Sequence, residues 1–312
     1  MENINYSIII PHKNTPDLLQ RCLDSIPVRD DVQVIVVDDD SDADKVDFEH
    51  FPQWKGNNYD CFFTKEGKGA GYARNVGLEH ANGKWVLFAD ADDYFLNDFQ
   101  LVLNHIFDNS PDIIFFDAIA VKESDLSRSH RIDHLNEMHI LYEEDPHKAS
   151  LKFRYLFGEP ICKITRRDLI ENQHIRFDEV PIHNDTTFSY LIGHYAKRID
   201  VNHTKIYCLT DSPGTISKND NSDAQRIRSK VFASKNRFLY KNNIPLFDNL
   251  LLKPIFYCLR NKDWKCLTRC LLIDRRYGFS IISLLMRFYA PNWQKKLIRL
   301  GLYKRLKYSY EA

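Results

Sequence analysis

The 312-residue sequence lacks several features that mark membrane-spanning, secreted and disulfide-linked proteins. No apolar run approaches the roughly 20 residues that span a bilayer, and the longest candidate is residues 279–286. The first residues have neither the basic start nor the apolar stretch of a secretory signal, so we expect a cytoplasmic protein. None of the seven cysteines forms a Cys-x-x-Cys pair. Reduced thiols are therefore expected, with Cys266 and Cys270 facing a core together.

The sequence also has no net charge, because 43 Lys and Arg balance 43 Asp and Glu. The balance is uneven along the chain. Residues 1–224 carry 23 basic and 39 acidic side chains, whereas residues 225–312 carry 20 basic and 4 acidic ones. This asymmetry indicates different partners for the two parts, such as a metal ion for the first and phosphate or a membrane surface for the second.

Apolar residues make up 44% of the chain, which is enough for a substantial core and argues against global disorder. The first 120 residues alternate short apolar runs with stretches of helical spacing. This alternation favours an α/β fold with a mostly parallel sheet covered by helices. We expect strands over residues 6–10, 32–37, 59–64, 84–89 and 112–118.

Helices and loops are expected between and after those strands. Residues 67–81 predict a glycine-bearing loop that enters a helix. Asn97 and Gln100 have the spacing of a capping box for the next helix. The apolar content falls over residues 122–150, which predicts an excursion or a mobile loop, and residues 211–223 are typical of a linker.

Two acidic clusters, residues 38–42 and 90–93, begin where apolar strands are expected to end. Ligands of open α/β sheets bind outside the carboxyl ends of the strands. Carboxylates packed this closely repel one another unless a cation lies between them, and Mg²⁺ or Mn²⁺ would take its other ligands from water and phosphate. The pattern indicates a site for a nucleoside diphosphate. The alternative for either cluster alone is an Asx turn or a helix cap.

The glycine-rich stretch at residues 66–71 adds a flexible backbone at the start of a helix, with cations at Lys68 and Arg74. Helix N-termini and basic side chains favour phosphate. The glycine spacing matches neither a Walker A loop nor the dinucleotide fingerprint, so a simple tight turn stays open as the alternative.

Four motifs follow one another in order: Ser7-Ile8-Ile9-Ile10-Pro11-His12-Lys13-Asn14, Val36-Val37-Asp38-Asp39-Asp40-Ser41, Ala73-Arg74-Asn75 and Phe88-Ala89-Asp90-Ala91-Asp92-Asp93. Together they resemble the family 2 glycosyltransferases, which are inverting enzymes with the GT-A nucleotide-diphospho-sugar transferase fold. The likeness covers about residues 5–120 and extends more faintly to about residue 217.

The resemblance implies a role for each matching residue in binding the nucleotide sugar. Pro11, His12 and Asn14 would line the nucleotide pocket, largely through the main chain. Asp38 or Asp39 would hydrogen-bond the base, usually uracil.

The resemblance also implies how the diphosphate and the metal are held. Arg74 and Lys68 would lie near the nucleotide or diphosphate, and Asp90 would contact ribose or sugar. Asp92 would ligate the Mn²⁺ or Mg²⁺ that bridges the phosphates, with Asp93 assisting.

The same family likeness implies that Asp185 is the general base that deprotonates the acceptor hydroxyl. Asn184 departs from the family pattern, because Glu is common at that position. The alternative for Asp185 is an acid at the start of a helix, where negative charge is favourable.

These observations divide the chain into a catalytic domain and an extension. The catalytic domain would be residues 1–218, with the nucleotide-sugar-binding part at 1–120 and the acceptor side at 121–218. Residues 225–312 would form a basic helical C-terminal extension.

Within the extension, residues 291–312 predict an amphipathic helix. Trp293, Leu297 and Leu300 share one face, and basic residues occupy another. This composition is typical of a helix that lies on an anionic membrane. The alternative is a helix that packs on the catalytic domain. No nucleic-acid partner is expected, because no nucleic-acid-binding motif accompanies the charge.

The sequence therefore favours a metal-dependent inverting glycosyltransferase that uses a nucleotide-sugar donor, UDP in our expectation. The acceptor would be a hydroxyl of a glycan or lipid-linked saccharide in cell-surface polysaccharide synthesis, at the inner face of the cell membrane. Two other classes stay open. One is a catalytically silent scaffold with the nucleotide-sugar fold, and the other is a nucleotidyltransferase on a related α/β sheet.

Overall fold

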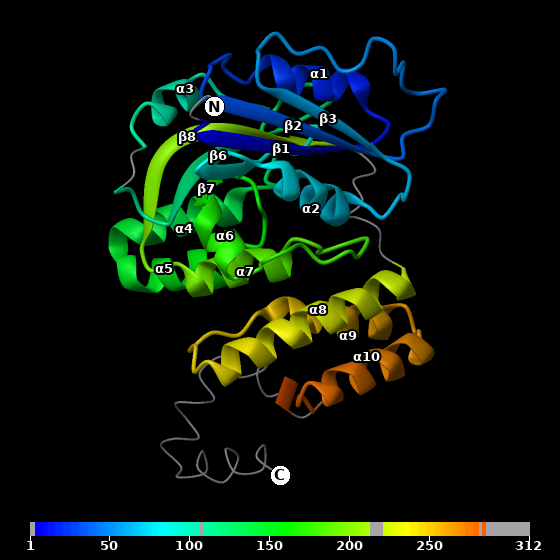
Figure 1. The fold of residues 1–312 in the computed structure, drawn as a ribbon. Helices are drawn as coiled ribbons and strands as arrows, with labels where there is room; N and C mark the ends of the chain where they lie inside the picture. Colours follow the sequence, from blue (N-terminus) through cyan, green and yellow to red (C-terminus); the bar gives the residue numbers. More distant parts are fainter. Residues whose placement is uncertain (1–3, 107–108, 213–220, 281–282, 285–312) are drawn as a thin grey trace. The chain divides into compact units, whose positions relative to one another are not determined.

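Buried apolar runs in the first two thirds of the chain form the strands of one eight-stranded sheet (Figure 1). The computed structural model describes residues 4–106, 109–212, 221–280 and 283–284. The strands are β1 (Tyr6–His12), β2 (Val32–Asp39), β3 (Tyr59–Thr64), β4 (Trp85–Phe88), β5 (Tyr94–Phe95), β6 (Ile113–Lys122), β7 (Lys163–Arg166) and β8 (Ile199–Asp211).

The sheet is parallel in its first half and mixed in its second. Its order is β3-β2-β1-β4-β7-β6-β8-β5. The first four strands run parallel to one another, β7 is antiparallel to both β4 and β6, and β6 pairs with β8 in parallel. All five strands expected from the sequence are present, with ends that differ by up to four residues. The second half is mixed because the short β7 inserts between β4 and β6.

Helices cover both faces of this sheet, which is why every residue of β2 is buried. In Figure 1, α1 and α3 lie on one side of the sheet and α4–α7 on the other. The helices of this part are α1 (Pro16–Asp24), α2 (Ala70–His80), α3 (Asp98–Leu103), α4 (Asp133–Glu144), α5 (Pro146–Tyr155), α6 (Arg167–Asn172) and α7 (Thr186–Tyr195).

Two local predictions are wrong. The stretch 122–150, expected to be a loop, contains α4 and the start of α5. The helix was missed because its composition is mostly polar. Its apolar face consists of few residues, among them the buried Leu135 and Met138. The capping box at Asn97 does not form either, because Asn97 makes no side-chain hydrogen bond to α3. Its φ and ψ of −56° and −34° are helical, whereas an N-cap residue normally has an extended backbone.

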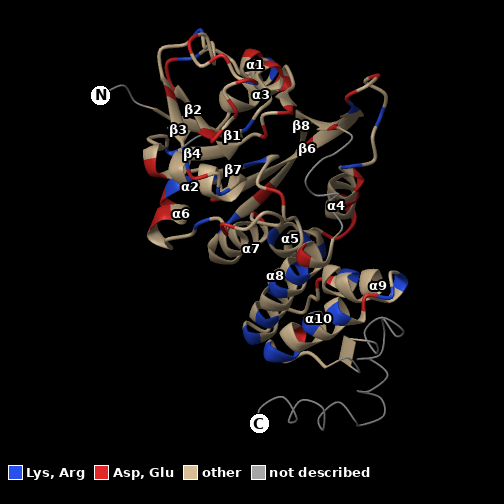
Figure 2. Cartoon of the chain, turned by 90° about the vertical axis from the view of Figure 1, so that its right-hand side faces the viewer, with Lys and Arg blue, Asp and Glu red and all other residues tan. Residues whose placement is uncertain are grey.

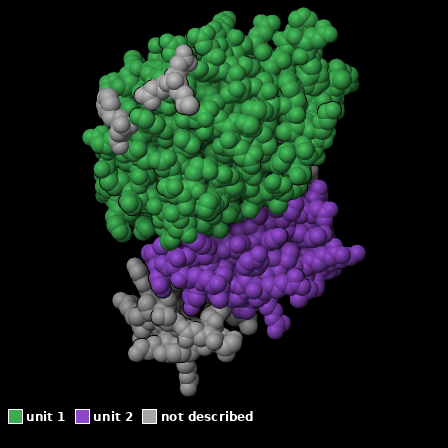
Figure 3. All heavy atoms as spheres, in the orientation of Figure 1, with its two compact units in different colours: residues 1–218 green, residues 219–312 purple. Residues whose placement is uncertain are grey.

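The described chain divides into two compact units, residues 1–218 and 219–312 (Figure 3). The second unit is helical, as the sequence predicts, over its described residues. It consists of α8 (Ser222–Lys241), the 3₁₀ helix η2 (Asn249–Leu252), α9 (Lys253–Arg260) and α10 (Trp264–Arg276). Residues 291–312, predicted to form an amphipathic helix, lie outside the described residues.

Among the described residues of the second unit, an apolar core and a buried ion pair hold the helices together. Phe232 of α8, Leu251 of η2 and Ile255 of α9 belong to one buried cluster. Beside them the ammonium of Lys235 donates to the carboxylate of Asp248 at 2.6 Å, and both side chains are buried. No helix among the described residues is long and apolar enough to cross a membrane.

Candidate active site

The carboxyl ends of β1, β2 and β4 meet at one edge of the sheet. Pro11 and His12, the last residues of β1, pair with Val37 and Asp38 of β2. The residue after β4, Ala89, donates its amide to the carbonyl of Ile9 in β1. Both acidic clusters of the sequence therefore emerge at the same edge, as expected for residues that follow parallel strands.

A buried hydrogen-bond chain joins the first two strand ends. The His12 Nδ1 and the Asp38 Oδ2 are 2.7 Å apart, and both side chains are buried. The amide of Thr15 donates to His12 Nε2, so Nδ1 carries the proton that is donated to Asp38. Asp38 also accepts from the hydroxyl and the amide of Ser41. Burial opposes ionisation of Asp38, but the hydrogen bonds from His12 and Ser41 outweigh it and lower the pKa of this carboxyl.

The loops that follow β1 and β2 are tied to each other. The Asn14 amide donates to the Ser41 hydroxyl at 2.8 Å, and the side chain of Asn14 exchanges two hydrogen bonds with Asp42. Asn14 has φ of 59°, in the left-handed region that Asn tolerates better than most residues. The main chain around Pro11, His12 and Asn14 is thus fixed before any ligand binds.

Asp39 fixes a third loop, the glycine-rich one before α2. Its carboxylate accepts from the amides of Lys68 and Gly69, at 3.2 and 2.6 Å. Gly69 has φ of 91°, a conformation that favours glycine. The ammonium of Lys68 lies 4.5 Å from the ring centroid of Tyr72 and 3.9 Å from Glu179. The structure therefore gives Asp38 and Asp39 hydrogen-bond partners within the protein, and a hydrogen bond between either of them and a base stays a prediction.

Arg74 of α2 joins the edge of the sheet to the segment before α7. Its guanidinium donates to Asp90 Oδ1 at 2.6 Å and to Asn184 Oδ1 at 3.0 Å. Arg74 is only 5% exposed and lies against the ring of Phe177. Asn184, which stands where the family usually has Glu, thus remains a hydrogen-bond acceptor without adding a second negative charge to this bridge.

The rest of that face of α2 also holds the segment before α7. A Cβ on Gly71 would lie 2.3 Å from the carbonyl oxygen of Asp178, so only glycine permits this close approach. Asn75 exchanges two hydrogen bonds with the main chain of Phe177. The Ala73-Arg74-Asn75 motif therefore positions the residues that lead to Asp185.

Asp90, Asp92 and Asp93 form a compact group in which carboxylate oxygens, one from each residue, lie within 4.8 Å of one another. Two like charges at this separation repel by roughly 3.5 kcal/mol at an effective dielectric constant of 20. Asp93 is fully buried, and its Oδ1 accepts from the amide of Thr210 at 2.7 Å. Its Oδ2 is also buried and has no hydrogen-bond partner.

The three carboxylates of this group, with their excess of negative charge, are what a divalent-cation site requires. Burial, followed by the charge of Asp90, raises the pKa of Asp92. The same two causes and the charge of Asp92 raise the pKa of Asp93 well above its usual value. A cation among the three carboxylates would relieve both effects, and oxygen ligands suit Mg²⁺ and Mn²⁺. The unpartnered Oδ2 of Asp93 is an additional reason to expect such an ion.

Asp185 precedes α7 and is partly buried. It stands at the N-cap position, so the alternative of an acid at a helix start stays open, although its carboxylate makes no capping hydrogen bond to the helix. Burial raises its pKa to about 6, with Arg74 lowering it and Glu159 raising it. A carboxylate with a pKa near neutrality is suited to accept a proton from a hydroxyl at physiological pH.

Three residues that support the acidic group were not singled out from the sequence. The hydroxyl of Tyr207 accepts from the amide of Asp90 at 2.9 Å, and Thr210 binds Asp93. Arg131 donates to the Thr210 carbonyl at 2.7 Å, and the charges of Asp93, Asp90 and Asp92 oppose the effect of its burial and raise its pKa. Tyr207 and Thr210 belong to β8, over 100 residues from the acidic group, and Arg131 lies in the stretch expected to be a loop. No local pattern could have revealed them.

Known proteins match this chain in sequence over part of its length. The model of the family described as Glycosyl transferase family 2 matches residues 7–173. A poly(ribitol-phosphate) beta-glucosyltransferase of Bacillus spizizenii is 36% identical over 93 residues, which are 28% of this chain and 15% of that protein. The putative glycosyltransferase EpsH of Bacillus subtilis is 25% identical over 184 residues, 55% of this chain and 49% of EpsH. The chain thus matches less than half of the length of either relative.

Solved structures match it over nearly its whole length. The crystal structure of S. aureus TarS 1–349 in complex with UDP-GlcNAc has a TM-score of 0.64 and 18% identity, and the match covers 99% of this chain and 92% of that one. The mannosyltransferase PcManGT from Pyrobaculum calidifontis, in complex with GDP-Man and Mn²⁺, has a TM-score of 0.51 and 16% identity, with 96% and 83% covered. These likenesses confirm the GT-A fold. Because the family model covers more than half of the chain, the protein belongs to glycosyltransferase family 2.

Proposed function

We propose that the protein is a metal-dependent inverting glycosyltransferase that moves a sugar from a nucleoside diphosphate to an acceptor hydroxyl. The observation that carries this proposal is that Arg74 connects two different carboxylate sites, through its hydrogen bonds to Asp90 and to Asn184, the residue before Asp185. On one side is the group of Asp90, Asp92 and Asp93, in which the buried Oδ2 of Asp93 has no hydrogen-bond partner. On the other is Asp185, with a pKa of about 6. One acid-rich site for a diphosphate-bound cation and one separate base are what a single displacement needs.

In this reaction Asp185 accepts the proton of the acceptor hydroxyl. The hydroxyl oxygen forms a bond to the anomeric carbon of the donor, and the bond from that carbon to the diphosphate oxygen breaks. The electron pair leaves with the nucleoside diphosphate. Because one displacement occurs with no enzyme nucleophile, the anomeric configuration inverts.

The leaving group needs positive charge near its phosphates. Asp92 and Asp93 would hold a Mn²⁺ or Mg²⁺ ion, with Asp90 beside it. Such an ion, when bound, neutralises the charge that develops on the departing diphosphate. Arg74 keeps Asp90 in place through its hydrogen bond, and Arg131 adds a further positive charge next to the group.

For the donor we propose a UDP-sugar, bound over the loops after β1 and β2. The His12–Asp38–Ser41 chain and the Asn14–Asp42 exchange order these loops in advance, so little entropy is lost when the nucleotide binds. The TarS structures contain UDP or UDP-GlcNAc, whereas PcManGT contains GDP-Man. TarS has the higher TM-score of the two, which favours uridine.

For the acceptor we propose a hydroxyl of a glycan or lipid-linked saccharide in the synthesis of a cell-surface polymer. The relatives include a minor teichoic acid biosynthesis protein, GgaB of Bacillus subtilis, and a glucosyltransferase named for poly(ribitol phosphate). Both names refer to the assembly of a polymer on the cell surface or its decoration.

A lipid-linked acceptor would require contact with the cytoplasmic membrane, and the second unit has a suitable surface. Figure 2 shows Lys and Arg along α8, α9 and α10. The outward residues of α10 include Lys265, Arg269 and two further arginines, together with Trp264 at 62% exposure and Leu272 at 53%. Basic residues interleaved with Trp and Leu suit an anionic lipid surface. The predicted helix at 291–312 would extend this contact.

The silent scaffold and the nucleotidyltransferase are less well supported. A scaffold has no need to keep three carboxylates this close together, with Asp93 buried, because their mutual repulsion destabilises the fold. In a nucleotidyltransferase, a phosphate oxygen of the acceptor attacks the α-phosphorus of a nucleoside triphosphate and pyrophosphate leaves. Because that acceptor oxygen is already ionised, the reaction would not need a base at Asp185.

Asp92→Asn tests the cation site. We expect it to abolish both transfer and the Mn²⁺-dependent rise in melting temperature that UDP produces, because the cation loses a ligand. Asp44→Asn, on an exposed loop, is the control and should behave as the wild type. The assignment fails if Asp92→Asn retains full turnover and the metal-dependent shift.

Asp185→Asn tests the base. We expect UDP binding to persist and transfer to fall by roughly 10²- to 10⁴-fold, the usual contribution of a general base. In the wild type, kcat/KM should fall as the pH drops below about 6, because Asp185 becomes protonated.

Stability separates this effect from misfolding. A raised pKa means that the folded state binds the proton more tightly than the unfolded state, so the contribution of Asp185 to stability falls as the pH rises from about 4 through 6. Asp185→Asn should therefore be at least as stable as the wild type at pH 7.5. Transfer within a few fold of the wild type would place the base elsewhere.

Charge reversal on α10 tests the membrane contact. Lys265→Glu with Arg269→Glu should weaken sedimentation with phosphatidylserine vesicles by roughly thirtyfold or more, since each basic residue contributes about 1 kcal/mol. The control reverses two exposed lysines of the first unit, Lys122 and Lys148, and should bind as the wild type does. Equal losses in both variants, or no vesicle binding by the full chain, would contradict the proposal.

A further inference from the structure

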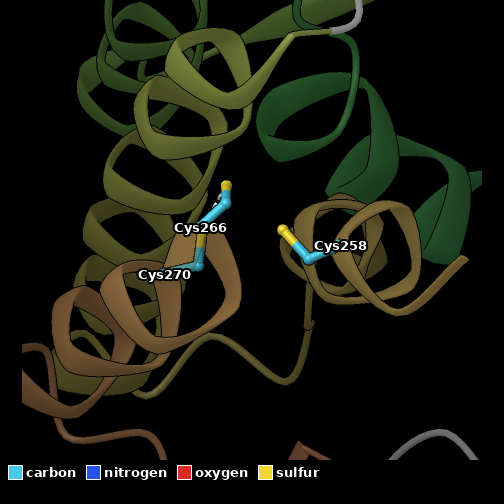
Figure 4. Close-up of side chains that lie close together, drawn as sticks. All are labelled: Cys258, Cys266 and Cys270. Atoms are coloured by element: carbon cyan, nitrogen blue, oxygen red, sulfur yellow. Dashed lines mark hydrogen bonds between the residues drawn. The ribbon is translucent and has the colours of Figure 1, made fainter. Parts of the chain in front are cut away.

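The second unit contains three cysteines that converge in its interior. Cys258 belongs to α9, and Cys266 and Cys270 lie one turn apart on α10. All three are buried, with exposures of 0, 2 and 0%, and their sulfur atoms lie within 4.8 Å of one another. Figure 4 shows the thiol of Cys258 pointing from α9 toward the other two. The sequence predicted that Cys266 and Cys270 face a core together, and the structure adds Cys258.

We propose that Cys258, Cys266 and Cys270 bind one thiophilic metal ion, Zn²⁺, which links α9 to α10. This site is separate from the carboxylate group of the first unit. Thiolate ligands select soft or borderline ions, whereas carboxylates prefer Mg²⁺ or Mn²⁺. The two sites would therefore not compete for the same ion.

The spacing of the sulfur atoms fits a metal–thiolate site. With a zinc–sulfur bond of about 2.3 Å, two sulfurs on a tetrahedral ion lie about 3.8 Å apart and two on a trigonal ion about 4.0 Å apart. The Cys266 and Cys270 sulfurs are 3.9 Å apart. The sulfur of Cys258 lies at most 4.8 Å from the other two sulfurs. A shift of less than an ångström would bring it to the same spacing, and a small change of its side-chain torsion angle can provide that shift.

The helix backbones that carry the thiols are anchored from α8 and from the start of α10. Asp263 accepts from the Cys266 amide at 2.9 Å and from the Ser222 hydroxyl at 2.6 Å. Ser229 donates to the Cys270 carbonyl at 3.2 Å. Supporting hydrogen bonds of this kind orient metal ligands before the ion arrives, which lowers the entropy that binding must overcome.

The charge of the second unit also favours such a site. Residues 221–280 contain 13 Lys and Arg against 4 Asp and Glu. A zinc ion with three thiolates carries a net charge of −1, which this basic surrounding would stabilise. Without an ion, burial raises the pKa of Cys258 to about 12 and also raises that of Cys270, so these two thiols stay protonated. Binding would then release protons and become stronger as the pH rises.

A metal ion between α9 and α10 would add to the apolar core that the described helices of the second unit form. Few large side chains are buried between α8, η2 and α9, and small domains often supplement such a core with a metal ion. Because an ion that binds only the folded state stabilises it, its loss should appear as a lower melting temperature.

The test is the metal content of the full chain carrying Asp92→Asn, so that the carboxylate group does not contribute. After purification without added metal or chelator, mass spectrometry of all transition metals should find about one soft ion per chain, mostly zinc. Cys258→Ala, Cys266→Ala and Cys270→Ala should each lower bound metal at least tenfold. Cys22→Ala is the matched control, because Cys22 is equally buried but lies in α1 of the first unit.

A second measurement does not depend on how the variants fold. Titration of the metal-free full chain with Co²⁺ should produce the near-ultraviolet charge-transfer band of a cobalt–thiolate site, at one equivalent, and Zn²⁺ should abolish it. A chain that is purified without metal and gives no such band would overturn the proposal. So would loss of metal in Cys22→Ala equal to that in the three cluster variants.

Discussion

The hydrogen-bonded bridge from Arg74 to Asp90 and Asn184 is the constraint on which the geometry of the site depends. It connects the edge of the parallel half of the sheet to the segment that carries Asp185. Arg74 is buried, so its charge needs a partner of opposite sign, and the Asp90 carboxylate supplies one at 2.6 Å. Gly71 and Asn75 hold the same segment from the same face of α2, which makes that helix the common support of both carboxylate sites.

Burial raises the pKa of Asp92, Asp93 and Asp185, but its chemical consequence differs because the neighbours differ. Asp92 and Asp93 lie beside other carboxylates, so their unfavourable charge is relieved best by a cation. Asp185 lies near Arg74, which moderates its pKa to about 6 and leaves it able to exchange a proton. One physical effect thus suits both the proposed cation site and the proposed base. Asp38 and Asp39 have a different role, because the hydrogen bonds that they accept hold in place the loop after β2 and the glycine-rich loop before α2.

The elements that could be predicted from the sequence are those that depend on a local pattern of residues. Strands such as β2 were evident because their apolar residues are consecutive and end in aspartates. The two-residue β5 was not evident, because it exists only through pairing with Tyr207 and Cys208 far along the chain. The same holds for the support that Tyr207 gives to Asp90 and for the approach of Cys258 to α10. These contacts depend on how distant segments meet, which no single stretch of sequence encodes.

The account predicts that the donor carbon is attacked once, from the side opposite the diphosphate. The most direct measurement is nuclear magnetic resonance of the sugar released when water replaces the acceptor, with a panel of UDP-sugars and Mn²⁺ and with spectra taken before the anomers equilibrate. The first sugar released should have the anomeric configuration opposite to that of the donor. Release of a sugar with the donor's own configuration would require two displacements or an internal return, and it would contradict the roles given to Asp185 and to the carboxylate group.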